Sequence, residues 1–419
     1  MSLSTDILKI AKAAKKASYQ MALLSTAEKN RALSRMAKAL RAQQSYLIRE
    51  NAKDLAAALK ANCSKAFIDR LTLNPKRISA MSDGLREIAK LKDPVGQLLE
   101  TIHRPNGLLI KKIRVPLGVV GIIYESRPNV TADCAGLCLK SGNAAILKGG
   151  REAIYSNKAI FKILKNCLKT TRIPLDALQL IESTDRQAMR ELLKLDECLD
   201  VIVPRGGEEL IRFVAENSRI PVIKHFKGVC HVYVHTQADL NMARTITLNA
   251  KLQKPGVCNA METLLVDRAV AREFLPPVIE DLQKAGCEIR GCAATRAIVK
   301  DNVKKATEED WRTEYLDLIL SVRVVENIDQ AIEHINTYGS HHSDTIVTKN
   351  KNQAQAFLDA VDSACVYVNA STRFTDGYEF GFGAEVGIST DKLHVRGPMA
   401  LEGLTSYKYE VYGNGQVRG

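Results

Sequence analysis

Long apolar runs are missing from this chain of 419 residues. Its most apolar stretch, Val115–Tyr124, contains Pro116 and two glycines, and it falls well short of the roughly 20 apolar residues that a membrane-spanning helix needs. The first 20 residues carry a lysine every few positions and have no apolar core or small-residue cleavage site, unlike a secretory signal. We therefore expect a soluble, cytoplasmic protein without a membrane partner.

Aromatic residues are also scarce, at 5% of the chain with a single tryptophan. The formal charge of +13 would suit a nucleic acid, a phosphorylated small molecule or only a solvated surface. Basic residues are spread along the chain, however, with no arginine-rich arm and no interleaved aromatics, which single-stranded nucleic-acid binders use. We expect no nucleic-acid partner, and phosphorylated ligands remain compatible.

Ten cysteines occur without a CxxC motif, which favours a reducing compartment over a disulfide framework. Cys134 and Cys138 lie one helical turn apart, yet no second Cys or His pair nearby would complete a zinc site. His225 and His231 are six positions apart with no third ligand, and the pair His341–His342 gives no better case. The spacing of these residues therefore predicts no metal.

The hydrophobic pattern changes period several times along the chain. Residues 1–97 read as successive helices, with Ser25 and Glu28 spaced as a capping box and Asn74-Pro75 as a helix start. Residues 98–115 read as two strands joined at Asn106-Gly107, a strong hairpin signal. The last segment, 398–419, alternates like an edge strand.

Two regions alternate short apolar runs with amphipathic helices, which is typical of parallel, doubly wound sheets. They cover 116–250 and 251–397, with a domain boundary expected near 250. The predicted fold class is α/β, with two doubly wound domains and a small β arm made from 98–115 and 398–419. Because ligands bind at the carboxyl ends of such strands, four loops attract attention, namely Glu125–Val130, Lys148–Arg151, Pro204–Gly207 and Lys224–Gly228.

Cys258 stands out among the cysteines because Pro255 and Gly256 exclude a helix around it, which leaves it on a loop between the two predicted domains. Flanking N–H groups and the charges of Lys251 and Lys254 would lower the pKa of its thiol. A thiolate suits acyl transfer, since a thioester splits one hard step into two. The alternative interpretation is a small buried hydrophobe, as most cysteines are.

Other candidate residues follow predicted strands. Asn129 would donate an amide hydrogen bond to an oxyanion, or would instead cap the helix beginning near Val130. Lys148 ends one strand before two glycines, and Gly206-Gly207 opens a helix whose N–H groups would face a phosphate. Such GG pairs are also common packing devices, and the GxGxxG dinucleotide fingerprint is missing.

Several segments, taken together, resemble the aldehyde dehydrogenase superfamily over nearly the whole chain. They are VPLGVVGIIYESRPNV, AAILKGG, HFKGVCHVYVHTQADL, QKPGVCNAMETLLV, TEYL and FGFGAEVGIST. The versions RPNVT, PRGGEEL, PGVCNA, INTYGS and RGPMALEGLTSYKY are similar to those of the γ-glutamyl phosphate reductase family. The resemblance implies NADPH-dependent reduction of L-glutamyl 5-phosphate, supplied by glutamate 5-kinase, to L-glutamate 5-semialdehyde and phosphate in proline biosynthesis.

The same resemblance implies roles for individual residues. Cys258 would be the nucleophile, Asn129 the oxyanion donor, Lys148 a contact to the cofactor ribose or 2′-phosphate, and Glu314 a contact to the nicotinamide ribose. It also implies an aldehyde dehydrogenase-like fold, with residues 1–97 and 116–250 as a Rossmann-like NADPH-binding domain and 251–397 as the catalytic domain. The β arm would form a homo-oligomer, either a dimer or a tetramer.

One departure from the superfamily concerns His225, which stands 33 positions before Cys258 where hydrolytic aldehyde dehydrogenases keep a general-base Glu. Without that Glu the acyl group is not passed to water, which fits a phosphorylating enzyme and also other acylating ones. Arg396 is a candidate anion contact, with an ordinary surface arginine as the alternative. The alternative functions are a hydrolytic aldehyde dehydrogenase and a non-catalytic basic scaffold.

Overall fold

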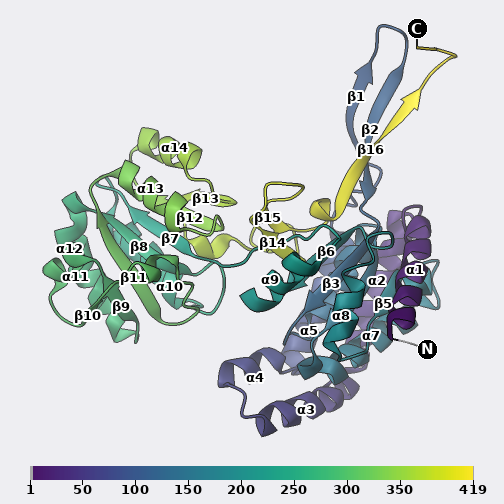
Figure 1. The fold of residues 1–419 in the computed structure, drawn as a ribbon, viewed down its shortest axis with the longest axis horizontal. Helices are drawn as coiled ribbons and strands as arrows, with labels where there is room; N and C mark the ends of the chain where they lie inside the picture. The colour runs from purple at the N-terminus through teal and green to yellow at the C-terminus, as the bar shows by residue number, and fades with distance from the viewer. Residues whose placement is uncertain (1–2, 419) are drawn as a thin grey trace. The chain divides into compact units, whose positions relative to one another are not determined.

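The computed structural model describes residues 3–418 and divides into two compact units (Figure 1). Unit 1 contains the chain up to Lys224 together with Gly381–Gly387 and the segment from Pro398 onward, and unit 2 contains His225–Phe380 and Ile388–Gly397. The sequence pattern placed the boundary near 250 instead. The difference arises because residues 230–234 form a strand hydrogen-bonded inside the sheet of unit 2.

Unit 1 begins with five helices, α1 (Leu3–Met21), α2 (Thr26–Ala42), α3 (Gln44–Lys60), α4 (Lys65–Leu71) and α5 (Pro75–Lys90). The two predicted helix starts are confirmed. Ser25 accepts from the backbone N–H of Glu28 while the Glu28 carboxylate accepts from the backbone of Ser25, and the side chain of Asn74 accepts from the N–H of Arg77. These local bonds satisfy amide donors that a first helical turn leaves open.

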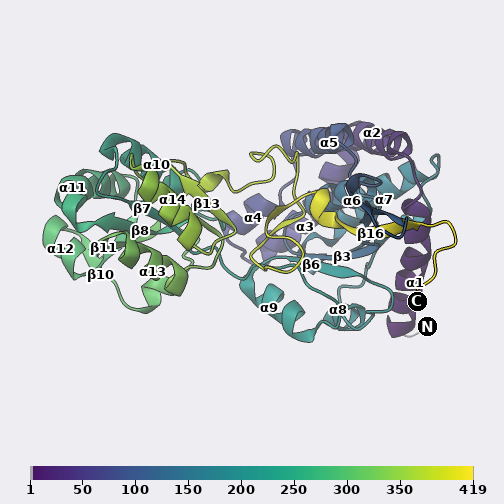
Figure 2. The ribbon, with the colours of Figure 1, turned by 90° about the horizontal axis from the view of Figure 1, so that it is seen from above.

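A four-stranded parallel sheet follows in unit 1, in the order β5-β4-β3-β6. Two of its strands, β3 and β6, are labelled in Figure 2. Its strands are β3 (Val119–Tyr124), β4 (Ala144–Gly149), β5 (Leu178–Leu180) and β6 (Val201–Arg205), connected through α6 (Val130–Lys140), α7 (Ile154–Leu168) and α8 (Arg186–Leu192), with α9 (Glu208–Asn217) after β6. Every residue of β3 and β4 is buried, as their continuous apolar runs require when helices cover both faces.

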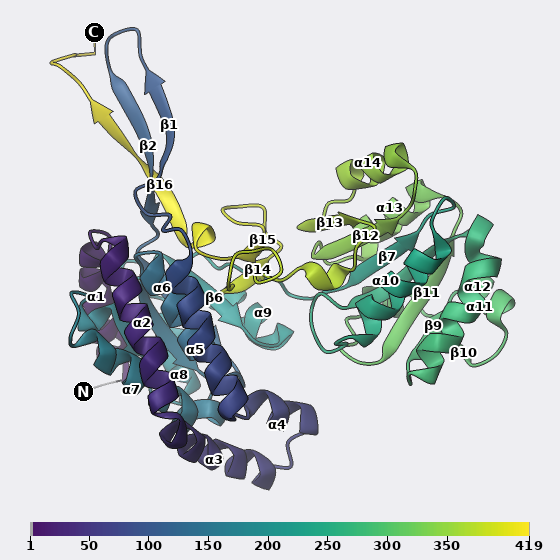
Figure 3. The same cartoon turned by 180° about the vertical axis from the view of Figure 1, so that it is seen from behind.

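The predicted arm is a three-stranded antiparallel ribbon in unit 1, in the order β1-β2-β16 (Figure 3). Its strands are β1 (Leu98–His103), β2 (Leu109–Pro116) and β16 (Thr405–Tyr412). Gly107 takes a positive φ of 87° in the turn between β1 and β2, which a glycine tolerates without strain. The predicted hairpin and the predicted terminal strand are therefore confirmed as secondary structure.

Unit 2 holds a seven-stranded parallel sheet in the order β10-β9-β11-β8-β7-β12-β13. Its elements are β7 (Cys230–Val234), α10 (Leu240–Leu252), β8 (Met261–Asp267), α11 (Arg268–Lys284), β9 (Glu288–Gly291), α12 (Ala293–Val299), β10 (Val303–Lys305), β11 (Ile319–Val325), α13 (Ile328–Tyr338), β12 (Ser343–Val347), α14 (Lys351–Ala360) and β13 (Cys365–Val368). Two short strands, β14 (Gly387–Ser389) and β15 (Gly397–Met399), pair outside this sheet.

Both faces of the unit 2 sheet are buried, as shown by neighbouring residues of β7. Val232 and Val234 belong to a core that includes Phe274 of α11, whereas Tyr233 points to a second core that includes Phe357 of α14. Successive strand residues face opposite sides, so helices must cover both sides. The predicted α/β fold with parallel sheets is confirmed. In the described part of the chain, no helix combines the length and the apolar character needed to cross a membrane.

Candidate active site

Three reactive side chains of unit 2 come together at one edge of its sheet. Cys258 lies just before β8, His225 just before β7 and His342 directly before β12, and β8, β7 and β12 are neighbours in the sheet. Because parallel strands begin at the same edge, the three preceding segments converge there. The sulfur of Cys258 and one nitrogen of each histidine all lie within 4.8 Å of one another. This is the amino edge of the sheet, not the carboxyl edge that the sequence analysis favoured.

The loop that carries Cys258 is held closely by the start of β7. The buried thiol of Cys230 donates to the carbonyl oxygen of Cys258 at 3.1 Å. A Cβ on Gly228 would lie 1.9 Å from the same carbonyl oxygen, so only a glycine lets the two backbones approach this far. The predicted loop around Cys258 is confirmed, and the thiol is partly buried, but the predicted place between the two domains is wrong, because the loop lies within unit 2.

Both histidines are oriented by their Nδ1 atoms. His225 Nδ1 lies 2.8 Å from the carbonyl oxygen of Ile388, which can only accept, so this nitrogen donates. His342 Nδ1 lies 2.8 Å from the hydroxyl of Ser343. The two rings meet edge to face with centroids 5.5 Å apart. Each imidazole is thereby fixed with Nε2 as the nitrogen that is left for chemistry.

The electrostatics of this cluster favour the thiolate. Burial by itself would raise the pKa of the Cys258 thiol, but the charge of His342 and a hydrogen bond from His225 hold the pKa well below its usual range. The predicted lowering of the thiol pKa is therefore confirmed, but its predicted cause, the charges of Lys251 and Lys254, is wrong. Lys251 is fully buried and paired with Glu262 at 2.6 Å, and Lys254 is exposed, so the histidines supply the effect.

Glu314 lies near enough to Cys258 for the two to influence each other electrostatically. Burial raises the pKa of its carboxyl and the nearby Cys258 raises it further, while a hydrogen bond from the N–H of Gly228 lowers it. Two residues later, Leu316 takes a positive φ of 54° and donates its N–H to Glu262 at 3.2 Å. The Leu316 turn is thus hydrogen-bonded to the buried pair of Glu262 and Lys251, which keeps the Glu314 segment in place.

Arg373, which the sequence analysis missed, lies on the short 3-10 turn η4 (Thr372–Phe374). Its Nε donates to Gln253 at 2.9 Å, on one side of the nucleophile loop. On the other side, Asn259 exchanges hydrogen bonds with η4, because the Thr372 hydroxyl donates to the Asn259 carbonyl at 2.8 Å. Burial lowers the pKa of the Arg373 guanidinium, and Cys258 opposes that shift. No local motif marks this arginine.

Asn129 of unit 1 occupies the cap position of α6, but its side chain makes no capping hydrogen bond. Its Nδ2 instead donates to Asp133 at 2.9 Å, and burial raises the pKa of Asp133 to about 6. The alternative interpretation is therefore confirmed for the position of Asn129 at the start of the helix, although its side chain does not cap the backbone. Its role as an oxyanion donor stays a prediction.

The cofactor candidates of unit 1 follow β4 and β6, at the carboxyl edge of its sheet. Lys148 is 7% exposed and donates to the Gly149 carbonyl at 3.2 Å, and burial lowers the pKa of its amine. The N–H of Gly207 donates to Glu125 at 3.1 Å, and a Cβ on Gly206 would lie 2.3 Å from that carboxylate. A phosphate at the Gly207 amide would thus have to displace Glu125, so the role of these glycines stays a prediction.

Arg396 is neither an isolated surface arginine nor an empty anion site. Its guanidinium contacts the Asp362 carboxylate at 2.9 Å and donates to the Asp362 carbonyl at 3.0 Å. Lys392 also contacts the same carboxylate at 2.7 Å. A substrate carboxylate would compete with Asp362 for Arg396, and the substrate role stays a prediction.

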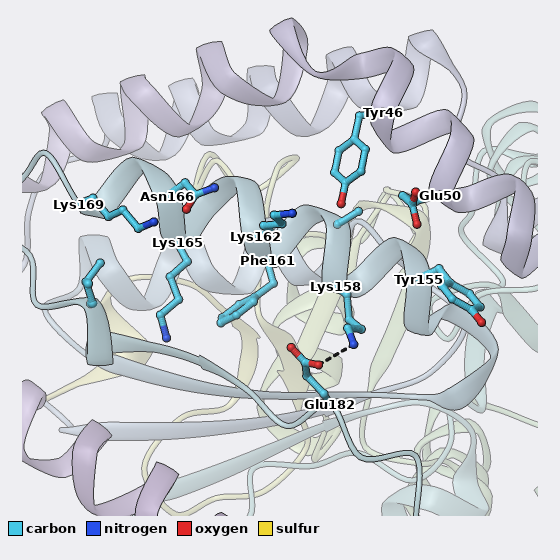
Figure 4. A pocket seen from close by; sticks show the side chains of 12 residues that line it. Tyr46, Glu50, Tyr155, Lys158, Phe161, Lys162, Lys165, Asn166, Lys169 and Glu182 are labelled. Carbon is cyan, nitrogen blue, oxygen red and sulfur yellow. Dashed lines mark ion pairs between the residues drawn. The ribbon is translucent and has the colours of Figure 1, made fainter.

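A pocket of about 510 Å³ in unit 1 lies between α3 and α7 (Figure 4). Four lysines line the pocket, spaced three or four positions apart along α7 and just beyond its end, at 158, 162, 165 and 169. Lys158 forms an ion pair with Glu182 at 2.6 Å. Tyr46 of α3 points toward α7 from the opposite wall. None of the predicted site residues is among the described lining residues, so this hollow is separate from the Cys258 chemistry.

Comparison with known proteins identifies the family of this chain. Residues 2–291 match the aldehyde dehydrogenase family. The gamma-glutamyl phosphate reductase of Nautilia profundicola is 56% identical over 96% of the chain and 98% of the relative, and that of Caldanaerobacter subterraneus subsp. tengcongensis is 57% identical over 97% and 98%. The crystal structure of the Thermotoga maritima gamma-glutamyl phosphate reductase has a TM-score of 0.96 at 47% identity and covers 99% of this chain and 100% of that one. The chain belongs to the aldehyde dehydrogenase family and, within it, to the gamma-glutamyl phosphate reductases.

Proposed function

We propose that this chain uses NADPH to reduce L-glutamyl 5-phosphate to L-glutamate 5-semialdehyde and phosphate, through a thioester on Cys258. The observation that carries the proposal is the thiol of Cys258, whose pKa is held low by His342 and His225 within a group of ligand atoms 4.8 Å across. A thiolate at neutral pH is the nucleophile that acyl transfer requires. Relatives more than 50% identical over nearly the whole chain carry the name of this reaction.

The first step is acyl transfer to sulfur. The Cys258 thiolate attacks the acyl carbonyl carbon, the C–S bond forms, and the C–O bond to the phosphate breaks. We assign the developing oxyanion to a backbone N–H and to Asn129, as the family resemblance implies. When the thiohemiacetal later collapses, the thiolate leaves again and the semialdehyde is released. A low thiol pKa helps both steps, because the same group is nucleophile and leaving group.

A nicotinamide cofactor supplies the hydride that reduces the thioester. Lys148 fits the cofactor role because its buried amine has a backbone carbonyl as its hydrogen-bond partner and lies at the carboxyl end of β4, where α/β sheets bind dinucleotides. We assign Lys148 to the ribose or 2′-phosphate, Gly206 and Gly207 to the phosphate region and Glu314 to the nicotinamide ribose. The choice of NADPH over NADH rests on this assignment of Lys148.

Arg373 supports an acyl phosphate as the substrate. It is the arginine tied to the nucleophile loop through Gln253, and its charge acts on Cys258. We assign it to the phosphate, which carries two negative charges at neutral pH and leaves as an anion. Arg373→Ala should raise the KM for phosphate in the reverse reaction about tenfold or more. Arg244→Ala, which removes an exposed arginine paired with Asp281, is the control.

Three broader assignments complete the proposal. We place the enzyme in the cytoplasm and downstream of a kinase that makes the acyl phosphate, glutamate 5-kinase. The β1-β2-β16 ribbon is assigned to homo-oligomer contacts, and Arg396 to a substrate carboxylate in competition with Asp362.

The deciding experiment measures NADP⁺ reduction by glutamate semialdehyde with phosphate present and then omitted. We expect turnover that depends on phosphate and disappears in Cys258→Ser. Cys292→Ser is the matched control, because hydrogen bonds also lower the pKa of this second thiol although it lies in a different loop. Equal turnover without phosphate would contradict the acyl-phosphate assignment, and full activity of Cys258→Ser would contradict the nucleophile.

A further inference from the structure

The Cys258 cluster has the composition and spacing of a metal site. We infer that Cys258, His225 and His342 bind a thiophilic divalent cation such as Zn²⁺, and that the bound cation blocks the enzyme reversibly. The three ligand atoms lie within 4.8 Å of one another, so small side-chain movements bring them to a common cation about 2.0–2.3 Å from each. One thiolate with two imidazoles is a donor set that suits Zn²⁺.

The outer hydrogen bonds of the two histidines match those of metal ligands. A metal-bound imidazole generally donates its other ring N–H to a carbonyl or another polar group, which fixes the ring and its tautomer. His225 Nδ1 donates to the Ile388 carbonyl, and His342 Nδ1 lies 2.8 Å from the Ser343 hydroxyl. Both rings are therefore already held with Nε2 as the coordinating nitrogen.

An independent observation points to a ligand at His342. Its side chain is fully buried, and within residues 3–418 its Nε2 has no hydrogen-bond partner. A buried polar nitrogen without a partner is costly, and a bound cation would satisfy it. Among the described residues the Nε2 atoms of His231 and His334 also lack partners, but both residues lie outside the cluster, so only the unpartnered nitrogen of His342 has two other ligand atoms beside it.

The site offers three protein ligands and so leaves the fourth tetrahedral position to water. Zinc sites with three protein ligands keep the fourth position open to water or substrate, whereas structural sites are closed by four protein ligands. The sulfur lone pair that would attack the acyl carbonyl is shared with the cation, so the thiolate stops acting as a nucleophile. The inhibitory part of this inference rests on the proposed function, whereas cation binding does not.

Binding is tested on the full chain with Co²⁺, which reports a thiolate ligand through a sulfur-to-cobalt charge-transfer band in the near ultraviolet. We expect the band in the unmodified protein and its loss in Cys258→Ser. His225→Gln and His342→Gln should each weaken Co²⁺ binding about tenfold or more. His341→Gln is the matched control. The imidazole of His341 is next to His342 in the sequence, but it bonds to the Asp362 carbonyl and lies outside the cluster.

Zn²⁺ should displace Co²⁺ and abolish the band, and a chelator should restore the unmetallated protein. In the phosphate-dependent assay, Zn²⁺ should inhibit, and chelation should recover the activity. A missing Co²⁺ band, or a band that survives in Cys258→Ser, would overturn the inference even if the enzyme is fully active. Inactive protein that still shows the Cys258-dependent band would contradict the proposed function and leave the cation site supported.

Discussion

Lys251 and Glu262 give the sharpest test of how the nucleophile loop is supported. Their side chains are fully buried and meet at 2.6 Å, and the second carboxylate oxygen of Glu262 accepts from the N–H of Leu316 at 3.2 Å. Lys251→Met would leave a buried carboxylate with one backbone donor and no cation. Removing one partner of a buried pair costs about 3–5 kcal/mol in the free energy of unfolding, and we expect a loss of that size.

The loss of unfolding free energy in Lys251→Met should be larger at high pH than at low pH. Burial raises the pKa of Glu262 to about 7, although Lys251 opposes the shift, from an ordinary value of 4.5. The folded chain therefore holds this proton more tightly than the unfolded chain, and the contribution of Glu262 to stability falls as the pH rises between those values. In Lys251→Met the cation no longer favours the carboxylate, so the pKa of Glu262 should rise further. The cost of the substitution should therefore grow as the pH rises above about 7 and be smallest in acid, where the carboxyl is protonated with or without Lys251.

Trp311 supplies the assay, since it is the single tryptophan of the chain and lies buried in unit 2, 6% exposed. The free energy of unfolding is measured in urea by the fluorescence of Trp311, for the variant and the unmodified protein, at about pH 5.5 and about pH 8.5. Lys284→Met is the matched control, because Lys284 and Glu280 also meet at 2.6 Å but are exposed, and such pairs contribute about 1 kcal/mol or less. An equal cost at both pH values, or a cost as small as that of the control, would refute the reasoning.

Three further predictions concern the site and one helix. In His342→Gln the thiol of Cys258 loses the histidine that lowers its pKa, so its alkylation by iodoacetamide should slow near neutral pH and recover in alkali; an unchanged pH profile would assign the effect elsewhere. Gly228→Ala places a Cβ 1.9 Å from the Cys258 carbonyl and should lower kcat/KM about 100-fold, whereas Gly256→Ala, whose nearest neighbour is 3.5 Å away, should have a much smaller effect. Ser25→Ala removes a capping box and should cost about 1 kcal/mol, measured by circular dichroism during thermal unfolding, and no change would mean that the box is not stabilising.

Features that depend on a few consecutive residues could be predicted from the sequence. The turn at Asn106-Gly107 and the capping box at Ser25 are decided by local backbone geometry, and the structure contains both. The same holds for the alternation of strands and helices, because the periods of buried residues differ between the two. The α/β architecture therefore follows from short-range patterns.

The environment of Cys258 could not be predicted in this way. His342 reaches the thiol only because β12 lies beside β7 and β7 beside β8, and this strand order is set by packing of the whole unit. Lys251 is adjacent to the loop in sequence, yet it turns inward to Glu262. Sequence proximity therefore suggested the wrong cation. The strand order also explains the displaced boundary, since the short apolar run of β7 gives no sign of which sheet it joins.

The ribbon of unit 1 has a consequence for synthesis on the ribosome. Strand β2 pairs with β1 within a short hairpin, and its other edge pairs with β16. Arg114 and Thr405, which bond across that edge, are 291 positions apart. At about 5–20 residues per second, translation leaves this edge uncovered for roughly 15–60 s. Three basic residues of β2, Lys111, Lys112 and Arg114, discourage pairing with another nascent chain during that interval, as charged side chains do on exposed strand edges.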